Sequence, residues 1–98
     1  MQLTSNKENG KLTILVSGRV DTTTASELEK TIFDSIDGIT ELVLDLKEMS
    51  YISSAGLRVL LKAEKKMKAQ GEMRLINVNN DVMEILDMTG FSDILTIG

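Results

Sequence analysis

Short segments with strand-like composition alternate along the chain with longer segments whose apolar residues have helical spacing. The strand-like segments include the aliphatic and β-branched residues 11–17, the apolar run Leu42–Leu44 and residues 72–78. Residues 21–36 and the segment from Gly56 onward carry apolar side chains every three or four positions. Because strand, crossover helix and next strand connect in a right-handed sense, neighbouring strands should be parallel, with the helices packed on the sheet. The order of segments therefore predicts an α/β fold.

An N-terminal hairpin should precede this alternation. Residues 2–8 and 11–17 flank Asn9-Gly10, a dipeptide typical of two-residue hairpin turns. Antiparallel pairing of these two segments would make the sheet mixed. We expect the second strand of the hairpin to end at Gly18, just before the first helix.

The two long helical segments have recognisable ends and apolar faces. Thr24 and Glu27 can form a capping box in the first segment. Gly71 should end the second segment. The apolar face of the first consists of Ala25, Leu28, Ile32 and Ile36, and that of the second continues from Gly56 through Leu60, Ala63 and Met67.

The C-terminal part of the chain predicts two more elements. Residues 81–89 should form a short helix closed by Gly90, and residues 93–97 should form a last strand. No repeat or low-complexity linker interrupts this order. A chain of 98 residues can bury one modest core. We therefore expect a single domain, residues 1–98.

The composition excludes several kinds of site. The chain has no histidine and no cysteine, which rules out a Ser-His-Asp triad, a disulfide and a thiolate metal site. It also lacks a phosphate-cradling glycine-rich loop and a clustered acidic loop of the EF-hand type. We therefore expect neither enzyme activity, nor a metal, nor a cofactor.

Charge and hydropathy limit the partners. There are 15 Asp and Glu residues against 11 Lys and Arg, so the chain lacks the basic surface that nucleic-acid binding needs. No apolar run approaches the ~20 residues of a membrane span, and the N-terminus does not have the pattern of a secretion leader. We expect a cytoplasmic protein that contacts neither nucleic acid nor membrane.

Two adjacent serines stand where a strand leads into the second helix, the end of an α/β sheet at which binding sites collect. Ser53 is a good N-cap residue, and capping alone would explain it. If Ser53 is the cap, Ser54 is free to present its hydroxyl to solvent at the helix N-terminus, where a phosphate would be stabilised. Gly56 costs about 1 kcal/mol of helix propensity relative to Ala. Close approach of another protein or of a neighbouring strand would explain this glycine.

The residues around these serines resemble a known family. The segment "LDLKEMSYISSAGLRVLL", residues 44–61, looks like the signature of STAS domains of the anti-sigma factor antagonist type. Residues 18–25, "GRVDTTTA", are similar to the segment that precedes the family's first helix, and residues 86–95, "LDMTGFSDIL", resemble its third helix and the following turn. The resemblance covers nearly the whole chain.

The resemblance implies a mechanism of partner switching. The unphosphorylated antagonist binds an anti-sigma factor that is also a serine kinase, and so frees a sigma factor. Phosphorylation ends this binding, and a serine phosphatase removes the phosphate. By position, the phosphoacceptor is Ser54. The residues expected to bind the partner are Asp21, Thr22, Ser53, Ser54, Ala55, Gly56, Leu57 and Arg58.

The side chains of the second helix divide this surface further. Its apolar stripe is wider than a core needs, and we expect Leu57, beside Ser54, to contact the partner while Leu61 packs against the sheet. Arg58, with Lys62 and Lys65, lies on the far side, where it is either solvated or attracts an acidic partner. Asp21 is either an ordinary capping residue or a contact to the kinase.

Three alternatives stay open at this stage. Many family members have Asp where this chain has Ser53, which makes Ser53 a rival phosphoacceptor. The domain could also act as a STAS scaffold subunit of a lipid-transport or signalling complex without reversible phosphorylation. Nucleotide binding near Asp21 and Ser54 is the third alternative, although no nucleotide-binding motif is present.

Overall fold

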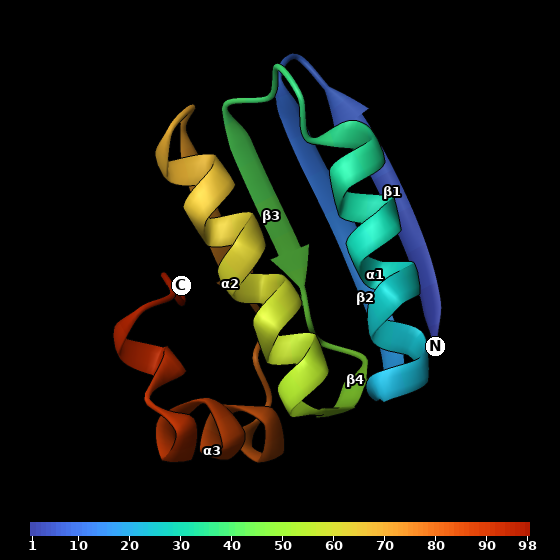
Figure 1. Cartoon of the computed structure of the whole chain (residues 1–98), viewed down its shortest axis with the longest axis vertical. Helices are drawn as coiled ribbons and strands as arrows, with labels where there is room; N and C mark the ends of the chain where they lie inside the picture. The colour runs from blue at the N-terminus through green and yellow to red at the C-terminus, as the bar shows by residue number, and fades with distance from the viewer.

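A five-stranded mixed sheet with helices on one face makes up the computed structural model, which describes residues 1–98. The strand order is β1-β2-β3-β5, and β4 pairs with the end of β2. Figure 1 shows β1, β2 and β3 behind the two long helices. The α/β fold with an N-terminal hairpin is confirmed. In chain order the elements are β1 (Gln2–Glu8), β2 (Lys11–Val20), α1 (Thr22–Ser35), β3 (Glu41–Asp45), β4 (Met49–Ile52), α2 (Ser54–Lys68), β5 (Glu72–Ile76), α3 (Asn80–Thr89) and the short 3-10 helix η1 (Phe91–Asp93).

The hairpin turn forms as its dipeptide predicts. Asn9 and Gly10 both have positive φ, 50° and 80°, which is the backbone of a type I′ turn. β1 and β2 are antiparallel, whereas β3 and β5 run parallel to their neighbours. Each parallel connection passes through a helix, as the alternation of segments requires.

The expected end of β2 at Gly18 is wrong, because the strand continues to Val20. Gly18 has a φ of 87°, and the register of the pairing shifts between Gly18 and Arg19. At this bend the strand changes its parallel partner from β3 to β4. Glycine can adopt the positive φ without a steric penalty, so it redirects the strand and does not end it.

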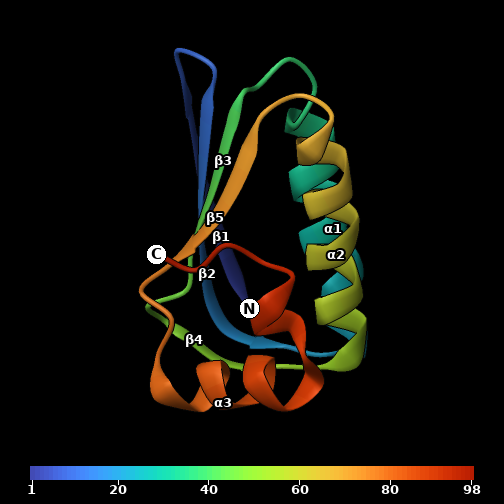
Figure 2. The same cartoon turned by 90° about the vertical axis from the view of Figure 1, so that its left-hand side faces the viewer.

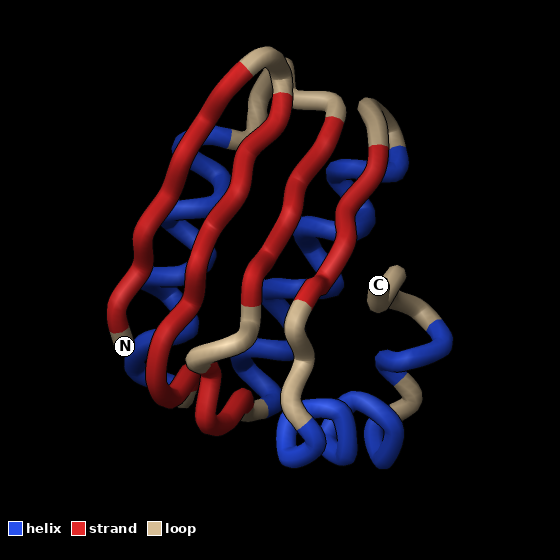
Figure 3. Tube along the Cα trace, turned by 180° about the vertical axis from the view of Figure 1, so that it is seen from behind, coloured by secondary structure: helices blue, strands red, loops and turns tan.

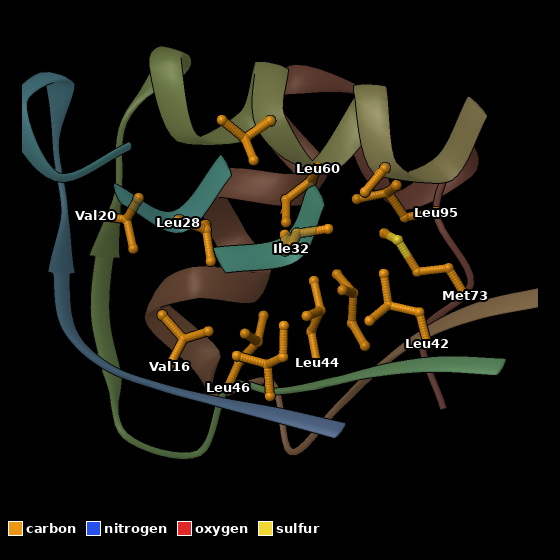
Figure 4. Packing of buried hydrophobic residues seen from close by; sticks show 14 of the residues in the cluster. Val16, Val20, Leu28, Ile32, Leu42, Leu44, Leu46, Leu60, Met73 and Leu95 are labelled. Carbon is orange, nitrogen blue, oxygen red and sulfur yellow. The ribbon is translucent and has the colours of Figure 1, made fainter. Parts of the chain in front are cut away.

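The core fills the space between the sheet and the two long helices (Figure 2). Alternate residues of β2 and β3 point into it and meet the apolar faces of α1 and α2, as Val16, Leu44 and Leu60 illustrate in Figure 4. The cluster contains 24 buried side chains, so the chain does build one continuous core. The opposite face of the sheet carries no helix (Figure 3).

Two expectations about the later part of the chain are wrong. Residues 93–97 do not form a strand, because η1 takes up Phe91–Asp93 and only Ile97 makes a bridge to β5. Gly71 does not end α2, which stops at Lys68 with Ala69 as its C-cap. A side chain at Gly71 would collide with the backbone carbonyl of Thr40, so close approach of two chain segments explains this glycine.

Candidate functional site

The two loops singled out in the sequence meet at one end of the molecule. β2 and β4 run side by side in parallel, with Val20 opposite Ile52. The chain then continues into α1 from one strand and into α2 from the other, and the Ser53 N–H donates to the Val20 carbonyl over 2.8 Å. Both helices therefore begin at the same end of the sheet (Figure 1). Asp21 and Ser53, the residues that follow the paired strands, become neighbours.

Asp21 is the N-cap of α1. Its Oδ1 atom accepts hydrogen bonds from the N–H groups of Thr23 and Thr24 at 3.0 and 2.9 Å. The Thr24 hydroxyl accepts in return from the Asp21 N–H, also at 2.9 Å, which completes a capping box. The expected box of Thr24 with Glu27 is wrong, because α1 begins at Thr22 and Thr24 is its third residue.

The charge of Asp21 is stabilised by this cap. Its pKa is lowered, first by the hydrogen bond from the Thr24 N–H, then by the Thr24 hydroxyl, with smaller contributions from the Thr23 N–H and the positive charge of Arg19. Asp21 therefore carries a full negative charge at neutral pH beside the start of α2. The adjacent Thr22 is exposed.

Ser53 and Ser54 have different surroundings. Ser53 is the N-cap of α2, and its Oγ atom accepts from the Gly56 N–H over 3.3 Å. Ser54 is the first residue of the helix and is exposed. Its hydroxyl makes no hydrogen bond within the chain. The cap predicted at Ser53 is confirmed, and Ser54 is left with a hydroxyl open to solvent.

Neighbouring strands account for Gly56. A β-carbon at this buried position would lie 2.7 Å from Ile52 Cγ1 and 2.8 Å from Val20 Cγ1. These distances are far below van der Waals contact, so only glycine lets α2 begin directly above β2 and β4. Of the two explanations left open for Gly56, close approach of a strand is the one observed. Ala55 beside it is half-buried.

Two of the leucines of α2, Leu57 and Leu61, have the reverse of the exposure expected. Leu57 is only 4% exposed and belongs to the core, whereas Leu61 is half-buried. Leu57 belongs to the same buried cluster as Val82 and Leu86 of α3 and Leu95 beyond η1, and it lines a groove with Thr89 and Phe91. A helical wheel of α2 alone takes no account of these later segments of the chain. Arg58 is exposed, as are Lys62 and Lys65.

Two hollows flank the start of α2. An apolar groove of about 350 Å³ lies on the side of α3, and a cleft of about 240 Å³ lies on the side of α1. Arg58 lines both of them. The groove is formed by Ser54, Leu57, Arg58, Leu61, Thr89 and Phe91, and the cleft by Thr22, Ala25, Ser26, Glu29, Ala55, Arg58, Val59 and Lys62.

An aromatic and cationic pair at this end of the molecule was not predicted from the sequence. The Arg19 guanidinium carbon lies 4.5 Å from the centre of the Tyr51 ring, and the two residues are partners in the β2–β4 pairing. Tyr51 is 36% exposed. Only the prediction of a strand over Met49–Ile52 could have placed these side chains together, and the burial of this segment, with two exposed residues between two buried ones, is not the alternation that indicates a strand.

No group of three or more acidic side chains is arranged so that it could hold a metal ion. None of the helices is both long enough and apolar enough to span a membrane.

Comparison with known proteins identifies relatives along the whole chain. The model of the STAS domain family matches residues 2–98. BtrV of Bordetella bronchiseptica, assigned as an anti-sigma factor antagonist, is 37% identical over 99 residues, which cover 99% of this chain and 85% of BtrV. The anti-sigma-B factor antagonist of Listeria monocytogenes is 31% identical over 94 residues, which cover 93% of this chain and 82% of the relative.

Solved structures agree on the fold. SpoIIAA of Bacillus, an anti-sigma factor antagonist, is 15% identical and superposes in its unphosphorylated form with a TM-score of 0.78, covering 99% of this chain and 87% of SpoIIAA. The phosphorylated form superposes with a TM-score of 0.77, covering 99% of this chain and 91% of SpoIIAA. Both forms of SpoIIAA thus share the architecture described above.

Proposed function

Since this chain is a STAS domain protein of the anti-sigma factor antagonist family, we propose that it acts as such an antagonist and works by partner switching. The unphosphorylated protein binds an anti-sigma factor that is a serine kinase, and a sigma factor is released. Members of the family are typically not enzymes, and in this proposal the chain contributes no catalytic residue, metal or cofactor. The switch operates in the cytoplasm, where sigma factors act.

The exposed, unbonded hydroxyl of Ser54 is the observation that carries this proposal. The kinase transfers the γ-phosphoryl group of a nucleoside triphosphate to Ser54 Oγ, the hydroxyl proton passes to a base of the kinase, and the diphosphate leaves. A serine phosphatase reverses the step by hydrolysis, with water as the nucleophile and inorganic phosphate as the product.

Ser53 is a poorer acceptor than Ser54 for a physical reason. Its Oγ atom accepts the hydrogen bond from the Gly56 N–H that caps α2. Loss of such a cap typically costs about 1 kcal/mol. Ser53 is half-buried and its hydroxyl is held over the first turn by this hydrogen bond, whereas Ser54 is exposed and its hydroxyl is open to a kinase. These surroundings favour Ser54 over Ser53 as the phosphoacceptor.

The phosphate acts on the interface and not on the fold. It adds a charge of about −1.5 to −2 at pH 7, which a helix N-terminus tolerates, and the first turn of α2 itself contains no acidic residue, since the negative charge of Asp21 lies at the start of α1. The kinase site that receives Ser54 holds nucleotide phosphates, and we expect acidic groups there as well. Like charges that meet across an interface cost several kcal/mol, so one phosphate should weaken binding about 100-fold or more.

We expect the residues around Ser54 to make the contacts with the kinase. Asp21 and Thr22 flank one side, and Ala55 and Arg58 follow on α2. Ser53, Gly56 and Leu57 contribute mainly by holding this surface in place, since Ser53 caps the helix and the other two are buried.

A comparison of baits tests the proposal. Wild type, Ser54→Asp and Ser53→Ala are used to recover proteins from lysate of the native host, with mass spectrometry of both the partners and the phosphorylated serine. We expect wild type and Ser53→Ala to recover a kinase that phosphorylates Ser54, and Ser54→Asp to lose it while its circular-dichroism spectrum is unchanged. Equal recovery of the same transporter or signalling subunits by all baits would contradict the switch and indicate a constitutive STAS scaffold.

A further inference from the structure

We propose that Arg58 is the internal partner of the phosphate on Ser54, and that it turns from the open surface to that phosphate when the serine is modified. This inference rests on the proposed function, because it concerns the same serine. It adds a second effect of phosphorylation to charge repulsion. The surface gains the negative charge of the phosphate, and the positive charge of Arg58 is no longer available to a partner.

The spacing on α2 places the two side chains on the same face. Ser54 and Arg58 are four residues apart in an unbroken helix, so their β-carbons lie roughly 5–6 Å from one another. The anionic residue stands N-terminal to the cationic one, which is the more favourable order for an i, i+4 pair. A guanidinium group can also donate two parallel hydrogen bonds to a phosphate, which a lysine cannot do.

Arg58 is free to make this pair. It is exposed and takes part in no salt bridge, hydrogen bond or ring contact within the chain. The other charged side chains that line the groove and the cleft beside Ser54 are Lys62 and Glu29. These two bond to one another over 2.6 Å and connect α2 to α1. A phosphate on Ser54 therefore finds one uncommitted cation in the two hollows, and it is Arg58.

The position of Arg58 explains why its capture matters to a partner. Its side chain lines the apolar groove on one side and the α1–α2 cleft on the other. In the unmodified protein it offers a positive charge between these two hollows to an acidic group of the kinase. Once it is paired with the phosphate, that charge is neutralised at the centre of the surface.

A titration of the phosphate tests the pair directly. The chain is produced with phosphoserine incorporated at position 54, so that no kinase is needed, and the second pKa of the phosphate is followed by ³¹P NMR. In wild type Arg58 should hold this pKa below its value in Arg58→Ala, by about 0.2–0.4 pH units. Arg58→Lys should give an intermediate value.

Lys65→Ala is the matched control. Lys65 is another exposed cation of α2, three turns from Ser54, so its removal changes the net charge equally without touching the phosphate. Its phosphate should titrate as in wild type. Identical pKa values in wild type, Arg58→Ala and Lys65→Ala, with unchanged circular-dichroism spectra, would overturn the inference.

Binding measurements separate this inference from the proposed function. For Arg58→Ala, the ratio between the affinities of the unphosphorylated and phosphorylated forms for the kinase should be about 1.4- to 2.3-fold smaller than for wild type, because the pair can change this ratio by no more than its own strength. If the kinase binds both forms of wild type equally, the proposed function fails even where the NMR titration supports the pair. If the ratio is large and unchanged in Arg58→Ala, the switch stands and the role of Arg58 is refuted.

Discussion

Substitution of Gly56 by alanine separates a structural role of this glycine from a role in binding. Alanine would improve the helix propensity of α2 by about 1 kcal/mol. Its β-carbon, however, would lie 2.7 and 2.8 Å from the Cγ1 atoms of Ile52 and Val20. Both neighbours are β-branched, fully buried and held in paired strands, so they have little freedom to move.

The two effects on stability have opposite signs, and the collision should be the larger. Overpacking of a core typically costs about 1–3 kcal/mol, and the rigidity of both neighbours of Gly56 places this case at the upper end. After the gain in helix propensity, we expect a net loss of about 2 kcal/mol in the free energy of unfolding. For a domain of this size, that corresponds to a fall in Tm of about 8–16 °C.

Urea denaturation measures this loss, and a double-mutant cycle with Val20→Ala identifies its cause. Removal of the Val20 methyl groups relieves one of the two close contacts. The double variant should therefore lose less free energy of unfolding than the two single variants lose together, by about 1 kcal/mol or more. The folded Gly56→Ala protein should still bind its partner, because position 56 is buried. A Gly56→Ala variant as stable as wild type, or strictly additive effects, would refute the steric explanation.

Two further predictions follow from the same surroundings. Leu57→Ala should lower the free energy of unfolding in urea by about 2–5 kcal/mol, because Leu57 is 4% exposed. Leu61→Ala, at a half-buried position, should lower it by less than about 1 kcal/mol. Equal losses in the two variants would contradict the difference in burial between these leucines. Asp21→Asn should be less stable than wild type at neutral pH. Since folding lowers the pKa of Asp21, its charge stabilises the fold above the unfolded pKa of about 4, and this stabilisation is lost as the pH falls through the folded pKa. Denaturation at pH 7 and near pH 3 should therefore show that the difference in unfolding free energy between wild type and Asp21→Asn is smaller at the lower pH. A difference that is constant with pH would show that the carboxylate charge is not what the cap requires.

Local signals in the sequence were sufficient for many elements of the fold. The turn at Asn9-Gly10 requires positive φ at both residues, and Asn and Gly are the residues that adopt it. Ser53 and Gly90 mark a helix start and a helix end by the hydrogen bonds and backbone angles that their residue types allow. Each of these features depends on a few consecutive residues, which is why it could be predicted.

Features that depend on a distant segment could not be predicted in this way. β4 is a strand because the extension of β2 beyond Gly18 offers it a partner, and neither segment indicates this alone. Leu57 shares its buried cluster with Val82, Leu86 and Leu95, which lie near the other end of the chain. The same distant contacts decide which side chains at the candidate site are open to solvent, so exposure was the least predictable property of the site.

The short strand β4 also determines why two adjacent serines differ. Its pairing with β2 fixes the chain up to Ser53, whose N–H is bound to the Val20 carbonyl. With that residue held, its hydroxyl lies over the first turn of α2 and accepts from the Gly56 N–H. Each further residue of a helix is rotated by about 100°, so Ser54 points away from the sheet that holds Ser53. The division between a structural serine and an available one is thus set by the β2–β4 pairing and not by the residue type.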